Sequence, residues 1–121
     1  MLEQSEVVRL NAHRLEELYS ELGEAGAENV VCRALEELAV RLSHTERCHR
    51  DGQLAEMRKS ARGLVAIADQ IGMQALSRVA ADVTIAVDND DPVAVAATLS
   101  RLLRIGNSSL SEVWEMHDIS I

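Results

Sequence analysis

The sequence is poor in aromatic residues, proline and lysine, and it contains no long apolar run. Its 121 residues include no phenylalanine, and Tyr19 and Trp114 are the only aromatic side chains, so we expect a core of aliphatic side chains. With one proline and six glycines, the chain has few residues that interrupt a helix, which predicts a mostly helical fold. No apolar run approaches the roughly 18 residues that a membrane-spanning helix needs, so we expect no membrane segment.

The overall charge argues against nucleic acid as a partner. The formal net charge is −8 at pH 7, whereas nucleic-acid binding needs a basic surface that displaces counterions from phosphates. Two aromatic residues also cannot form a platform on which bases stack. The two cysteines, Cys32 and Cys48, form no disulfide pattern, and the N-terminus lacks the basic stretch that is typical of a signal peptide. We therefore expect a cytoplasmic protein.

No catalytic or cofactor-binding motif is found in the sequence. The chain lacks G-x-S-x-G, H-E-x-x-H and a phosphate-binding P-loop. Two pairs of adjacent carboxylates, Glu16–Glu17 and Glu36–Glu37, suggest acid–base chemistry at first sight, but adjacent residues on a helix point in different directions. Such pairs are typical of a solvated surface, and we expect no enzyme activity, no cofactor and no metal site.

Hydrophobic periodicity predicts five helices in one domain that covers residues 1–121. Apolar residues recur at steps of three and four within residues 4–22, 27–49, 53–71, 73–87 and 92–114. The first three helices are expected to end at Gly23, at Asp51–Gly52 and at Gly72. Asp91 is expected to cap the last helix, with Pro92 at its first position. Gly106 and the three polar residues after it are expected to bend or interrupt that helix.

The helix predicted over residues 53–71 carries the most regular apolar stripe. The steps along this stripe are three, four, three, four and three, which place its residues on one face. The stripe consists of Leu54, Met57, Ala61, Leu64, Ala68 and Ile71. We expect this face to be buried. Five amphipathic helices with short connections predict an all-α fold, an antiparallel helical bundle.

Basic residues are concentrated where the second and third predicted helices meet. Residues 47–62 contain five basic and two acidic residues, a local charge of +3 in an otherwise acidic chain. The only lysine of the protein, Lys59, lies within this segment. The sequence therefore predicts a basic surface on the third helix and the adjoining end of the second.

Residues 54–83 resemble the centre of a histidine-containing phosphotransfer (HPt) domain. That family carries a pattern close to A-H-x-L-K-G-x-x-x-x-(I/L)-G on one long helix, and the matching scaffold residues here are Ala61, Leu64, Ile71 and Gly72. Arg62 stands in place of the phosphoacceptor histidine, Val65 in place of the lysine and Ala66 in place of the glycine. The resemblance implies a four-helix core over about residues 27–114, with the first helix as an additional lid. It also implies that phosphoryl transfer has been lost.

An arginine in the histidine position implies docking without transfer. A guanidinium is always protonated and is not a nucleophile, but it binds carboxylates through two hydrogen bonds. In the signalling systems that use HPt domains, the partner is a receiver or histidine kinase domain, and a receiver's active site is a cluster of acidic side chains. The predicted partner-binding residues are Arg58, Lys59, Arg62, Val65, Ala66 and Asp69. The alternative interpretation is that these basic residues form an ordinary solvated helix face.

A second cluster, S-H-T-E-R-C-H over residues 43–49, allows three interpretations. His44 and Cys48 are four residues apart and share a helix face, but a zinc site would need further ligands from elsewhere in the chain. The segment also resembles the phosphorylated box of sensor kinases, although Glu46 and His49 depart from its pattern. The simplest interpretation is a helix end whose basic side chains interact with the negative end of the helix dipole.

These observations leave three hypotheses about function. The first is a non-catalytic HPt-like interaction module of two-component signalling that binds a receiver or kinase domain. The second is a small helical homodimer with a structural or scaffolding role. The third is an active phosphotransfer protein that uses His44.

Overall fold

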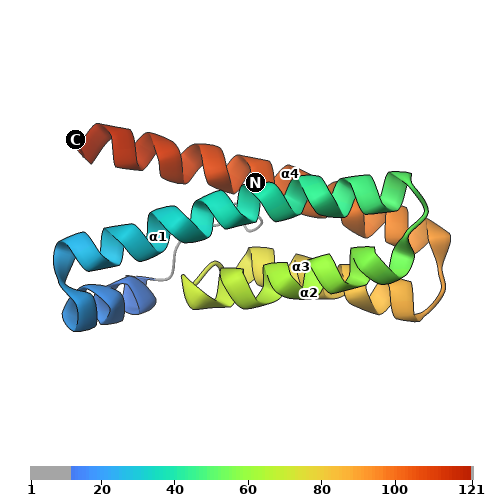
Figure 1. Cartoon of the computed structure of the whole chain (residues 1–121), viewed down its shortest axis with the longest axis horizontal. Helices are drawn as coiled ribbons and strands as arrows, with labels where there is room; N and C mark the ends of the chain where they lie inside the picture. The colour runs from blue at the N-terminus through green and yellow to red at the C-terminus, as the bar shows by residue number, and fades with distance from the viewer. Residues whose placement is uncertain (1–11, 121) are drawn as a thin grey trace, which may run out of the picture.

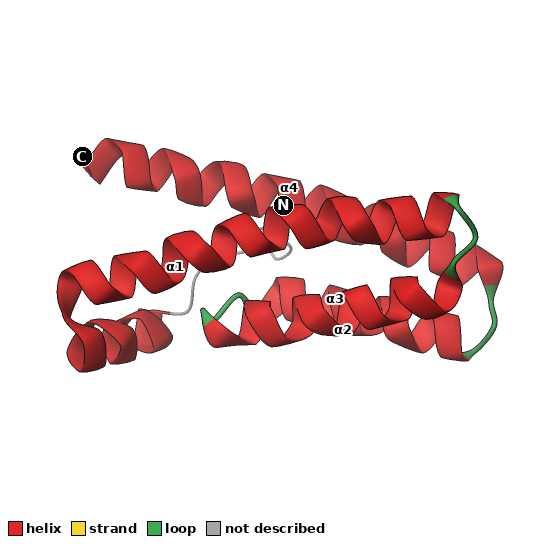
Figure 2. Cartoon of the chain, in the orientation of Figure 1, coloured by secondary structure: helices red, strands yellow, loops and turns green. Residues whose placement is uncertain are grey.

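The computed structural model describes residues 12–120, and all four of its secondary-structure elements are helices (Figures 1 and 2). They are α1 (Ala12–Arg50), α2 (Leu54–Gln70), α3 (Gln74–Asp88) and α4 (Pro92–Ser120). Each helix packs against the next one along the chain, and α1 also packs against α4. The predicted all-α helical bundle is therefore confirmed. Within the described residues, no helix is both long and apolar enough to cross a membrane.

The first two predicted helices form one element, α1, which contains a sharp kink. Gly23 has the non-helical backbone angles φ 76° and ψ 174°, and the chain changes direction there (Figure 1). The predicted helix break at Gly23 is confirmed, and helical segments lie on both sides of it, without an extended connection between them. Residues 4–11 of the first predicted helix lie outside the described part of the chain. The segment before the kink is held at the end of α2, because Arg14 Nε donates a hydrogen bond to the Gln70 carbonyl oxygen at 2.7 Å.

The two turns on either side of α2 close in the same way. At the end of α1, the Gln53 amide donates to the Cys48 carbonyl at 2.8 Å; at the end of α2, the Met73 amide donates to the Ala68 carbonyl at 2.8 Å. Both turns contain a glycine with positive φ, at positions 52 and 72. This bonding pattern is the Schellman motif, in which the glycine satisfies carbonyls that a helix end leaves without partners. The predicted ends of these two helices are confirmed.

The turn between α3 and α4 also has its predicted features. The Ala94 amide donates to Asp91 Oδ1 at 3.1 Å, so Asp91 caps α4, and Pro92 is the first residue of the helix. Asp90 occupies the left-handed position, with φ 55°, where the other turns have glycine. The prediction that α4 ends at Trp114 is wrong, since the helix extends to Ser120.

The core is aliphatic, as expected, and α2 contributes one continuous stripe to it. Met57, Ala61, Leu64, Ala68 and Ile71 are buried. Leu54 departs from the prediction, since it is 39% exposed. It is the first residue of α2 and lies at the end of the bundle, where fewer neighbours cover a side chain. Thr45 and Ser60 add a buried hydroxyl pair between α1 and α2, with their oxygens 2.7 Å apart.

The predicted interruption of the last helix at Gly106 is wrong. The helix α4 continues through residues 106–109, and Gly106 is buried. A Cβ atom at this position would lie 2.6 Å from Leu42 Cδ1, so the glycine allows α4 to approach α1 closely. The buried Ser109 fits the helix because its hydroxyl donates to the Ile105 carbonyl at 2.6 Å.

Two glycines within helices should respond oppositely to replacement by alanine. Alanine is the better helix former by about 1 kcal/mol. At Gly63 a Cβ would meet only the end of the flexible, 39% exposed Arg41 side chain, so we expect Gly63→Ala to raise the free energy of unfolding by about 0.5–1 kcal/mol. At Gly106 it would meet buried Leu42, and overpacking of about 1–3 kcal/mol should exceed the propensity gain.

Urea unfolding of the two variants measures this difference. A rise in stability of similar size for both would mean that α1 and α4 are not in close contact at Gly106.

Candidate functional site

The six predicted partner-binding residues all lie on α2, outside its buried stripe. Lys59, Arg62, Ala66 and Asp69 are exposed, whereas Arg58 and Val65 are half-buried. Because α2 is continuous from Leu54 to Gln70, the helical repeat fixes their directions. Arg58, Arg62, Val65 and Asp69 follow at steps of four, three and four, so they form one ridge beside the stripe. Ala66 borders this ridge, and Lys59 lies about 100° further round the helix than Arg58.

Asp88, the last residue of α3, completes the site from a second helix. Arg58 Nε donates to Asp88 Oδ1 at 2.6 Å, and Arg58 Nη2 donates to Asp88 Oδ2 at 3.0 Å. A side-on contact of this kind uses both oxygens of the carboxylate and is the strongest geometry for an arginine–carboxylate pair. Asp88 is not among the site residues predicted from the sequence. The sequence does contain a signal that could have identified it. When two consecutive helices are joined by a short turn, the start of the first lies beside the end of the second, which places Asp88 near Arg58.

The charges at the site act on one another. The pKa of Asp88 is lowered, mainly by its hydrogen bond from Arg58; partial desolvation opposes this, and the positive charges of Arg58 and Arg62 lower the pKa further. The same pair raises the pKa of Arg58, again mainly through the hydrogen bond. Within the described residues, Arg62 makes no ion pair of its own, although it lies close enough to influence Asp88. The site therefore holds one neutralised arginine next to one that remains available.

The two guanidinium groups of this arrangement can bind an anion but cannot accept a phosphoryl group. Guanidinium groups donate hydrogen bonds to carboxylate or phosphate oxygens and accept no phosphoryl group. Val65, which packs against the core, and the small Ala66 add a low apolar edge beside the exposed Arg62. The surface thus combines a cation with an apolar margin, which suits contact with an acidic protein surface.

The second predicted cluster is more enclosed. His44 Nε2 lies 3.5 Å from Cys48 Sγ, so the two residues share a face as their spacing predicts. Cys48 is buried and His44 is half-buried. Among the side chains that the structure describes, no three from His, Cys, Asp or Glu converge in a way that could hold a metal ion. Phosphorylation of His44 stays a prediction.

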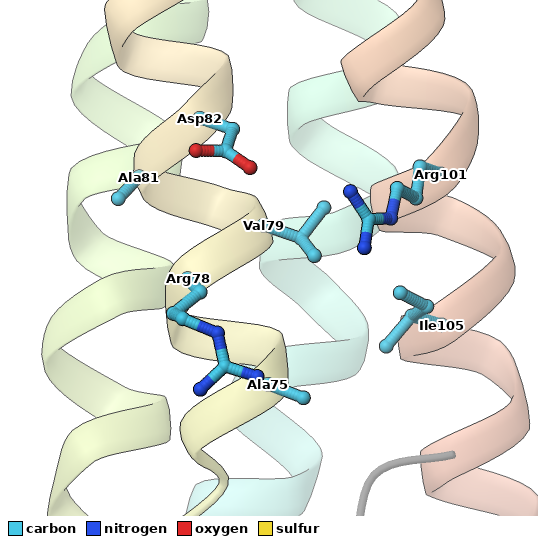
Figure 3. Close-up of a pocket in the computed structure, with 7 residues that line it drawn as sticks. All are labelled: Ala75, Arg78, Val79, Ala81, Asp82, Arg101 and Ile105. Carbon is cyan, nitrogen blue, oxygen red and sulfur yellow. The ribbon is translucent and has the colours of Figure 1, made fainter. Parts of the chain in front are cut away.

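A groove between α3 and α4 was not anticipated from the sequence. It has a volume of about 380 Å³ and is lined by Ala75, Arg78, Val79, Ala81, Asp82, Arg101 and Ile105 (Figure 3). In Figure 3 the guanidinium of Arg101 extends from α4 toward Val79 on α3. Because the lining includes Asp82 as well as Arg78 and Arg101, the groove has mixed charge and does not favour one class of ligand. It occupies the flank of α3 that faces α4, whereas Asp88 pairs with α2.

The pKa of Asp88 can be tested directly. We expect the carboxyl carbon of Asp88 to titrate below the ordinary value of 3.8 in an NMR pH series. Arg58→Gln should raise the midpoint most, and Arg62→Gln should raise it less. Because folding lowers this pKa, the ion pair stabilises the folded state at pH values above the ordinary pKa of the carboxyl group. This stabilisation is lost as the pH falls through the lowered pKa. A midpoint that does not move in Arg58→Gln would contradict the ion pair.

No protein-family model, curated protein or solved structure matches the chain. The resemblance to HPt domains therefore depends on the residues quoted above and stays a prediction.

Proposed function

We propose that the protein is a non-catalytic, HPt-like interaction module of two-component signalling. In this proposal the helices form an antiparallel four-helix bundle, with residues before Gly23 as the additional N-terminal helix. The observation that carries the proposal is Arg62, which is exposed at the phosphoacceptor position, directly after buried Ala61 and before buried Leu64. An HPt histidine needs such a place at the edge of the buried face. An arginine there keeps the surface and removes the nucleophile.

The proposed partner is a receiver or histidine kinase domain in the cytoplasm. The proposed partner-binding residues are Arg58, Lys59, Arg62, Val65, Ala66 and Asp69, and Asp88 faces Arg58 from α3. Arg62 is the main anchor, because Arg58 is already neutralised within the protein. Its fork of N–H donors fits the clustered carboxylates of a receiver's active site.

One observation supports the alternative of a homodimer. Tyr19 and Leu22 are three residues apart on α1 and are 43% and 48% exposed, so they form a small apolar surface before the kink. The other large apolar residues that are exposed among the described side chains lie on four different helices, and they are Val40, Leu54, Ile85 and Val93. A dimer through Tyr19 and Leu22 should dissociate on dilution, and Tyr19→Ser with Leu22→Ser should shift sedimentation to the monomer.

The first functional prediction concerns phosphoryl transfer. Mixed with a phosphorylated receiver domain or an autophosphorylated kinase, the protein should gain no acid-labile phosphate, because Arg62 cannot accept a phosphoryl group. Radiolabel transfer measures this, and an active HPt domain serves as the positive control. Label on His44 would replace the present proposal with an active phosphotransfer protein.

The second functional prediction concerns the binding surface. Arg62→Glu should weaken binding of a receiver domain by about 10-fold or more, because it replaces an attractive contact by a repulsive one. Arg58→Glu should have a smaller effect, since Asp88 already neutralises Arg58. Arg78→Glu is the matched control, with the same charge change on an exposed residue of the α3–α4 groove. Isothermal titration calorimetry compares the three.

The same variants separate binding from folding. Arg62→Glu and Arg78→Glu change exposed helix positions and should alter the free energy of unfolding by no more than about 0.5 kcal/mol. Leu64→Ala removes a fully buried side chain and should lower it by about 2–5 kcal/mol. Equal binding by Arg62→Glu and the unaltered protein would assign Arg62 to an ordinary solvated surface.

A further inference from the structure

Asp88 occupies two of the five N–H donors of Arg58, the pair that makes a side-on contact with a carboxylate. The Nε and Nη2 atoms of Arg58 both point to Asp88, at 2.6 and 3.0 Å from its two oxygens. This is the side-on contact that an incoming carboxylate would make with a free arginine. A partner can therefore form this side-on contact with Arg58 only after Asp88 has left it.

Resting on the function proposed above, we propose that Asp88 is a built-in competitor for the partner and that docking proceeds by carboxylate exchange. A partner carboxylate binds first at Arg62. A second carboxylate of the same partner then replaces Asp88 on Arg58. The surface thus selects partners that present at least two neighbouring carboxylates, because a single carboxylate gains Arg62 alone.

The position of Asp88 makes this exchange easy. The side chains of Arg58 and Asp88 are 35% and 50% exposed, so water can solvate the carboxylate when it is released. Exposed ion pairs contribute little to stability, because their attraction is screened and both side chains lose mobility. Asp88 is also the last residue of α3, where the helix dipole disfavours a negative charge, and the following turn adds Asp90 and Asp91. The contact with Arg58 offsets this repulsion, but the ion pair remains accessible to solvent.

The chain offers matched variants for a test. Asp88→Asn removes the competing charge and Asp88→Glu keeps it. Asp82→Asn makes the same charge change on the same helix, at the flank that faces α4. Arg58→Gln, alone and combined with Asp88→Asn, shows whether the effect of Asp88 passes through Arg58.

The probe is a capped tetra-aspartate peptide, titrated into each full-length variant at about 0.15 M salt, where the Debye length is about 8 Å. Chemical shifts of the arginine Nε–Hε groups report binding at Arg58 and Arg62. We expect Asp88→Asn to bind the peptide about two- to fivefold more tightly than the unaltered protein, in proportion to the strength of an exposed ion pair. Asp88→Glu and Asp82→Asn should bind like the unaltered protein. In the Arg58→Gln background, Asp88→Asn should give a clearly smaller gain, because only the weaker electrostatic effect of Asp88 at Arg62 is then removed.

Three results would overturn the exchange. They are unchanged or weaker binding by Asp88→Asn, an equal gain for Asp82→Asn, and a gain from Asp88→Asn that is undiminished in the Arg58→Gln background. The first would mean that Asp88 positions Arg58 for binding, and the other two would mean that only net charge matters.

A parallel titration with purified receiver domains separates this inference from the proposed function. A gain with the peptide, together with no receiver binding to any variant, would retain the exchange and reject the receiver as partner. Receiver binding that depends on Arg62 but is not strengthened by Asp88→Asn would retain the function and reject the exchange.

Discussion

Burial of one aliphatic stripe on α2 determines where the charged side chains of that helix lie. Met57, Ala61 and Leu64 are fully buried, so α2 cannot rotate without exposing them. With that rotation fixed, Arg58 and Arg62 must lie at the edge of the stripe, on the side of α3. The candidate site is therefore a consequence of core packing, since the same interaction that stabilises the fold also directs the arginines.

The turn between α2 and α3 determines which residues of the two helices lie side by side at the site. The Met73–Ala68 hydrogen bond closes this turn, and Ile71 and Met73 are buried beside it. The two helices are therefore paired from this end, and their lengths bring the first turn of α2 to the last turn of α3. Arg58 meets Asp88 there, 30 residues away in the sequence. A change of register by one turn would separate the pair and leave both arginines available.

Sequence periodicity predicted the local features of the fold but not the contacts between helices. The α2 stripe, the stops at Gly52 and Gly72 and the cap at Asp91 depend on neighbouring residues, so they can be recognised locally. The burial of Gly106 against Leu42 and the pairing of Arg58 with Asp88 depend on helix register, which no single segment encodes. For the same reason, a glycine that permits close packing was interpreted as a helix interruption.

The charge distribution restricts how an acidic partner could reach Arg62. The chain carries a net charge of −8, so beyond the Debye length of about 8 Å an acidic surface experiences weak net repulsion. Attraction begins only at short range, where a carboxylate of the partner reaches Arg62, since Asp88 already neutralises Arg58. Such a surface gains little from long-range steering and discriminates through contact geometry instead. The two-point carboxylate recognition of arginine meets that requirement, whereas a lysine at position 62 would offer a point charge without a preferred direction.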